Sequence, residues 1–130
     1  MNDAEFLGAL ETCTLPETDF GHAAHVRACY LYLKSGDFVS ALARLRDAIR
    51  RYAGSLGKPE RYHETITVAY AALIHEKMAE HDDGDWATFA KNNPELFTPN
   101  LLQRIYPASQ LESELARRIF ILPRGGRRVD

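Results

Sequence analysis

Three of the five histidines in this 130-residue chain lie where two helices could bring their rings together. His22 and His25 are three positions apart, which at about 100° per residue places both rings on one side of a helix. His63 belongs to a later helical segment, on the stripe that also carries its apolar residues. Neutral imidazole is the commonest protein ligand of divalent transition metals. Packing of the two helices therefore predicts a metal site formed by His22, His25 and His63.

A site with three protein ligands leaves a coordination position open, which is typical of catalytic metals. Zinc, iron, copper and nickel all suit imidazole, so the sequence predicts a divalent transition metal without choosing among them. Glu64 could serve as a further ligand or general base, and Tyr62 or Thr67 could orient bound water or substrate. Arg117 could pair with Glu64 or with an anionic substrate. The first hypothesis is a metal-dependent enzyme acting on a small-molecule substrate, with Glu64 and Tyr62 catalytic and Thr67 and Arg117 binding substrate.

The second hypothesis is a non-enzymatic helical interaction or regulatory module with structural histidines. Its rings form a polar network that holds the helices in register, and an exposed apolar face binds a partner or a second copy in a homodimer. Ring nitrogens that converge within metal-ligand reach favour the enzyme, whereas rings that are hydrogen-bonded separately favour the module. A metal sensor or carrier is a third interpretation, which keeps the metal site but lacks a substrate-sized cavity.

Other chemically active residues carry weaker signals. His75 points about 120° away from His63 around the same helix, so it is a poor co-ligand. His81 lies in an acidic segment that is typical of a solvated linker. Cys29 is more typical of a small core residue than of a thiolate ligand or nucleophile. Four arginines of one helix could bind an anion but are more typical of a solvated face: Arg44, Arg46, Arg50 and Arg51.

Helices are predicted to position all these side chains. Apolar residues recur at helical spacing in four main segments, and alternating strand patterns are nearly absent. The main helices are expected over residues 3–13, 19–34, 38–53 and 60–80, with shorter ones over 86–91, from 98 or 100 to 106, and over 110–119. The expected fold is an all-α, single-domain, up-down helical bundle of about four main helices plus short C-terminal helices.

The amino-acid composition limits which binding partners and which cellular compartment are expected for this chain. A hydrophobic fraction of 45% and a charged fraction of 26% are ordinary for one globular domain, expected over residues 1–123 with a basic flexible tail over 124–130. A net charge of −2 argues against nucleic acid as a partner. No apolar run approaches the roughly 20 residues of a membrane span, and no signal peptide is recognisable. With only two cysteines, the chain is expected to be cytoplasmic.

Residues 20–26 read F-G-H-A-A-H-V, an F-x-H-x-x-H start, and residues 62–65 read Y-H-E-T. Together with a later pattern, these two motifs resemble a family of small, uncharacterised bacterial helical proteins. The resemblance covers about residues 18–123 and includes Tyr106, Ser109, Leu111, Ser113, Ala116, Arg117, Phe120 and Pro123. It implies one common pattern that contains His22, His25, Tyr62, His63, Glu64, Thr67 and Arg117. The three histidines are also similar, by analogy alone, to the metal sites of DinB-like bundles.

Overall fold

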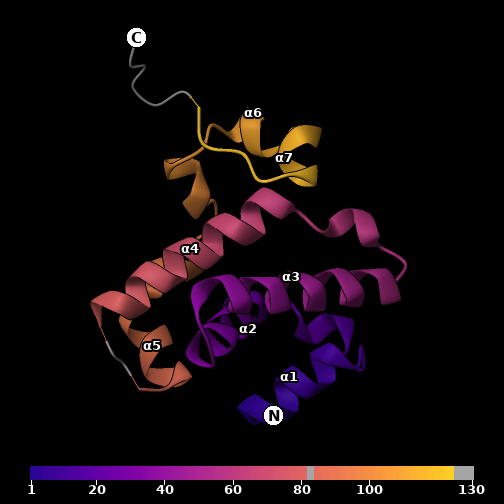
Figure 1. Cartoon of the computed structure of the whole chain (residues 1–130), viewed down its shortest axis with the longest axis vertical. Helices are drawn as coiled ribbons and strands as arrows, with labels where there is room; N and C mark the ends of the chain where they lie inside the picture. The colour runs from indigo at the N-terminus through magenta and orange to yellow at the C-terminus, as the bar shows by residue number, and fades with distance from the viewer. Residues whose placement is uncertain (82–83, 125–130) are drawn as a thin grey trace.

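The computed structural model describes residues 1–81 and 84–124. Over these residues the chain forms seven α-helices and four short 3₁₀-helices and no β-strand, which confirms the all-α fold class. The α-helices are α1 Asp3–Glu11, α2 His22–Lys34, α3 Phe38–Ser55, α4 Glu64–Glu80, α5 Trp86–Asn92, α6 Ala108–Leu111 and α7 Glu114–Arg118 (Figure 1). The 3₁₀-helices are Glu17–Asp19, Pro59–Arg61, Pro94–Phe97 and Leu101–Arg104.

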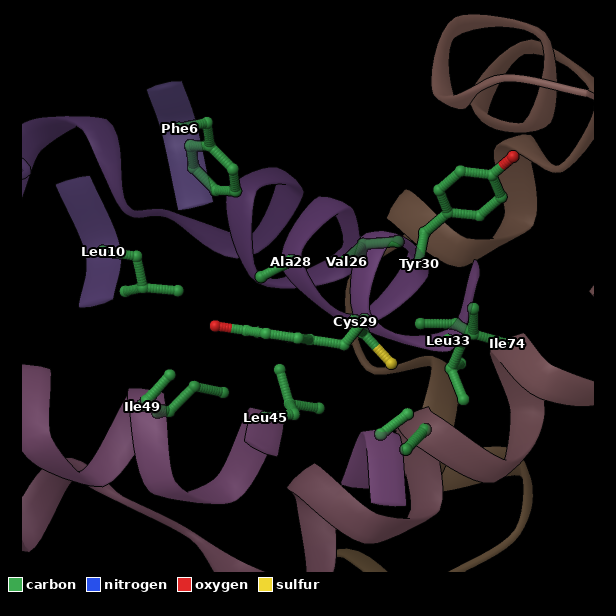
Figure 2. Packing of buried hydrophobic residues seen from close by; sticks show 14 of the residues in the cluster. Phe6, Leu10, Val26, Ala28, Cys29, Tyr30, Leu33, Leu45, Ile49 and Ile74 are labelled. Carbon is green, nitrogen blue, oxygen red and sulfur yellow. The ribbon is translucent and has the colours of Figure 1, made fainter. Parts of the chain in front are cut away.

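The main hydrophobic core lies between α1, α2, α3 and α4. Helix α2 contacts both α3 and α4, and α1 packs against α3. Figure 2 shows the side chains of these helices pointing toward one another, with Leu10 from α1, Cys29 from α2, Leu45 from α3 and Ile74 from α4 among them. All four of these residues are buried. Helix α3 buries Ala41, Leu45, Ala48, Ile49 and Tyr52 at helical spacing, which is the pattern of a helix that packs one face on the core.

Two helices begin later than the apolar pattern predicts. The expected helix 19–34 starts with the 3₁₀-helix Glu17–Asp19, and α2 follows from His22 with Gly21 as its N-cap. The expected helix 60–80 is interrupted after the 3₁₀-helix Pro59–Arg61. His63 has extended backbone (φ −129°, ψ 110°), and its side chain accepts a hydrogen bond from the backbone N–H of Ile66. This side chain therefore caps α4 and does not belong to its first turns.

A C-terminal layer covers the N-terminal half of α4. Helix α7 packs on α4, and α6 and α7 lie at the end of the molecule opposite α1 (Figure 1). The expected helix 110–119 is divided in two, because the Ser113 side chain accepts a hydrogen bond from the Ala116 N–H and starts α7. The backbone after α7 is non-helical from Ile119 to Arg124, a segment here called the C-terminal strap.

Buried polar side chains fasten the C-terminal strap to the helices. The hydroxyl of Thr65, on α4, donates to the Ile119 carbonyl (2.8 Å) and accepts from the Ile121 N–H (3.2 Å). The Gln110 side chain bonds the backbone of Leu122 and Arg124. The expected flexible tail of residues 124–130 therefore begins with a hydrogen-bonded Arg124, and the rest of it lies outside the described residues. No helix in the described part of the chain is long and apolar enough to cross a membrane.

Candidate functional site

His63 uses both ring nitrogens to hold secondary structure together. Its Nδ1 accepts the Ile66 N–H at 3.1 Å, so the ring proton is on Nε2. Nε2 donates to the Leu111 carbonyl at 2.6 Å. One imidazole thus caps α4 and ties it to α6 in the C-terminal layer. Neither nitrogen is left to bind a metal.

His22 and His25 both lie in the first turns of α2, but their rings bond different carbonyl groups. The Nε2 of His22 lies 2.9 Å from the Leu96 carbonyl oxygen, in the 3₁₀-helix Pro94–Phe97. The Nδ1 of His25 lies 2.9 Å from the Gly21 carbonyl oxygen, one turn back along its own helix. The His25 ring also stacks on Phe20, with 3.9 Å between ring centroids.

The predicted metal site of His22, His25 and His63 is therefore wrong, and with it the divalent transition-metal cofactor and the metal-dependent enzyme. Within residues 1–81 and 84–124, no group of three or more His, Cys, Asp or Glu side chains is placed to hold a metal ion. The physical reason is that each ring satisfies a separate backbone carbonyl, and two of these carbonyls come from segments far along the chain. Rings bonded separately are what the interaction or regulatory module predicts.

Tyr62 and Glu64 form a compact polar cluster with Arg46 of α3. The Tyr62 hydroxyl donates to Oε1 of Glu64 (2.5 Å), and Arg46 donates to both carboxylate oxygens (3.0 and 2.9 Å). Burial raises the pKa of Glu64, but these hydrogen bonds and the charges of Arg46 and Arg50 outweigh it, so the pKa is lowered. Burial and the Glu64 contact raise the pKa of Tyr62 to about 12. Glu64 is thus a stable anion and Tyr62 a neutral donor; their predicted catalytic roles stay predictions.

A cleft of about 350 Å³, here called the central cleft, lies between α2, α3 and α4. Its apolar wall comes from all three helices and consists of Val26, Cys29, Leu45, Ile49, Ile66 and Ile74. His22, His25, Thr67 and Tyr70 add polar atoms to the lining. The Thr67 hydroxyl donates to the His63 carbonyl at 2.8 Å, so it also supports the start of α4.

A second depression, here called the arginine groove, lies between α3, the 3₁₀-helix Pro59–Arg61 and α7. Tyr62, Glu64 and Arg117 line this groove and not the central cleft. Arg117 donates to the Glu60 carbonyl (2.6 Å), and the partner of Glu64 is Arg46 rather than the expected Arg117. The structure therefore divides the predicted constellation between two places, and Thr67 and Arg117 do not meet in one site.

The remaining candidates are consistent with structural roles. Cys29 is a buried free thiol whose pKa burial raises to about 12, which keeps it from acting as a thiolate at neutral pH. His75 is exposed and packs against Phe38, with 4.9 Å between ring centroids. Sequence reasoning named Arg46 and Arg50 among arginines that could bind an anion but favoured a solvated face for them. Both line the arginine groove, on the one helix face that their spacing of four predicts.

Comparisons of the chain with protein-family models, with curated proteins and with solved structures gave no match.

Proposed function

We propose that this chain is a helical binding module that takes a small, mostly apolar molecule in the central cleft. The observation that carries the proposal is the cleft itself, with walls from three helices and a volume of about 350 Å³. This volume lies in the range of small-molecule sites, which are typically apolar with a few polar groups that fix orientation. The separately bonded histidine rings support a binding module rather than a metal enzyme.

His25 defines the polar chemistry of the ligand. Because Nδ1 is engaged by the Gly21 carbonyl in the neutral ring, its proton is on Nδ1 and Nε2 is an acceptor. Within the described part of the chain, Nε2 has no hydrogen-bond partner, and His25 is one of the residues that line the cleft. Burial lowers the pKa of His25 and outweighs the Gly21 hydrogen bond, which raises it, so the ring is neutral at pH 7. The matching ligand is an apolar molecule that brings one O–H or N–H donor.

The motif residues support the same location. His22, His25 and Thr67 line the cleft, while His63 caps the helix that carries Thr67. We propose that the F-x-H-x-x-H motif of the family that the chain resembles describes this cleft, and that the histidine of Y-H-E-T holds the start of its α4 wall.

The test is a titration of isotope-labelled protein with 4-propylphenol and with its methyl ether, followed by amide NMR shifts. The ether lacks the O–H donor, so it is expected to bind about tenfold more weakly than the phenol. His25→Leu should remove this preference, and His75→Leu, which changes an exposed histidine outside the cleft, should keep it. Ile66→Trp places a larger side chain on the cleft wall and should weaken the binding of both compounds.

Saturable shifts in α2, α3 and α4 that depend on His25 would support the proposal. Two results would contradict it: neither compound binds saturably to the native protein, or His25→Leu and Ile66→Trp, both folded by circular dichroism, bind as the native protein does.

A further inference from the structure

The arginine groove gathers positive charge from distant parts of the chain. It has a volume of about 750 Å³, and its arginines come from α3 and α7: Arg46, Arg50, Arg51, Arg117 and Arg118. Three carboxylates share the lining, those of Asp47, Glu60 and Glu64. The whole chain has a net charge of −2, so this local excess of cations runs against the overall balance.

Most of the groove charges are already engaged. Arg46 holds Glu64 through both carboxylate oxygens, and Arg51 is paired with Asp47 one turn away on α3. Arg118 reaches Glu114, outside the groove, at 4.0 Å.

Arg50 and Arg117 differ from these three arginines. Among residues 1–81 and 84–124, no carboxylate lies within ion-pair distance of either. The Arg50 guanidinium lies 5.5 Å from the centre of the Tyr62 ring. Within the described residues, the Arg117 side chain donates one hydrogen bond, to the Glu60 carbonyl, and the other N–H donors of its guanidinium group remain. Two guanidinium groups on the groove wall are thus available to an anion.

We propose that the arginine groove binds the phosphate group of a small phosphorylated molecule, with Arg50 and Arg117 as its principal ligands. Guanidinium groups bind phosphate through paired N–H donors, which lysine cannot imitate. A phosphate monoester carries a charge of about −1.5 to −2 at pH 7 and so matches the excess of arginines over carboxylates. The groove is larger than a phosphate group, which leaves room for the organic part beside Tyr62. This site is separate from the central cleft and does not depend on the function proposed for it.

The experiment is a titration of the full chain with phenyl phosphate at constant ionic strength, followed by the Nε–H signals of the arginine side chains. Acetate and inorganic phosphate serve as comparison ligands. The expected result is saturable binding of phenyl phosphate with shifts at Arg50 and Arg117, and binding of acetate at least about tenfold weaker, because it offers fewer oxygens and one charge.

Arg50→Gln and the Arg50→Gln/Arg117→Gln double variant test the two residues, and Arg104→Gln is the matched control at an exposed arginine outside the groove. Each groove substitution should weaken the binding of phenyl phosphate by about tenfold, and the control substitution should change this affinity by less than about twofold. The Arg50 side chain forms no hydrogen bond or ion pair with the described residues, so its single variant stays informative if Arg117→Gln loosens α7. The proposal is overturned if binding does not saturate, if acetate binds as well as phenyl phosphate, or if Arg104→Gln weakens binding as much as Arg50→Gln.

Discussion

Replacement of His63 by alanine gives the most direct test of the role that the structure assigns to this residue. The substitution removes the acceptor for the Ile66 N–H at the start of α4 and the donor to the Leu111 carbonyl. A lost N-cap costs about 1 kcal/mol. A lost hydrogen bond between helices costs about another 1 kcal/mol. His63→Ala is therefore expected to lower the free energy of unfolding by about 2 kcal/mol, and Tm by about 7 °C for a chain of this length.

His63→Asn separates the two contributions. Asparagine is among the best N-cap residues, and its short side chain can accept the Ile66 N–H but cannot span the distance to Leu111. It should therefore recover about 1 kcal/mol of the loss. The measurements are urea unfolding followed by circular dichroism and thermal melts with and without a chelator. The reasoning is refuted if asparagine is no better than alanine, or if a chelator lowers Tm of the native protein, as a metal site at His63 would require.

Three further predictions concern the C-terminal strap, His25 and Glu64. Thr65→Val removes the hydroxyl that bonds the Ile119 carbonyl and the Ile121 N–H, so the free energy of unfolding measured in urea should fall by about 2 kcal/mol. Unchanged amide exchange at Ile121 would contradict this prediction. Because burial lowers the pKa of His25, this ring binds a proton more tightly in the unfolded chain than in the folded one. The free energy of unfolding should therefore fall as pH drops below about 6.5, and His25→Leu should make that decline less steep. Because the pKa of Glu64 is lowered, its contribution to folding stability is present above about pH 4.5 and lost at lower pH. Glu64→Gln should lower the free energy of unfolding at pH 7 by about 1–2 kcal/mol. Equal stability of the native protein and this variant at pH 7 would count against the pair of Glu64 with Arg46.

Positions of the helices could be predicted from the sequence, because amphipathic periodicity is a local property. The apolar stripe of α3 and the cap residue Asp37 mark that helix, and its observed end differs from the expected one by two residues. The break before α4 was harder to recognise. Histidine is a rare cap, and a pattern of apolar spacing does not show that Tyr62 and His63 have extended backbone.

Which side chains come together in the candidate site was harder still to predict from the sequence. The sequence placed His22 and His25 correctly on one helix, because a separation of three positions fixes their relative direction around it. The direction of a ring nitrogen depends on the nearest backbone acceptor, and for His22 that acceptor is 74 residues away. Such a contact leaves no trace in local spacing, so three histidines on predicted apolar stripes resemble a metal site whether or not their rings converge.

By itself the sequence determined the helical class, the approximate positions of the long helices and the residues able to do chemistry, since all of these follow from residue type and local spacing. Only the tertiary structure decided which of those residues meet. It assigned His63 to the start of α4, Glu64 to Arg46, and Arg50 to the same groove as Arg117. The physical reason is that long-range packing selects one set of hydrogen-bond and charge partners for each polar side chain, and that selection separates the central cleft from the arginine groove.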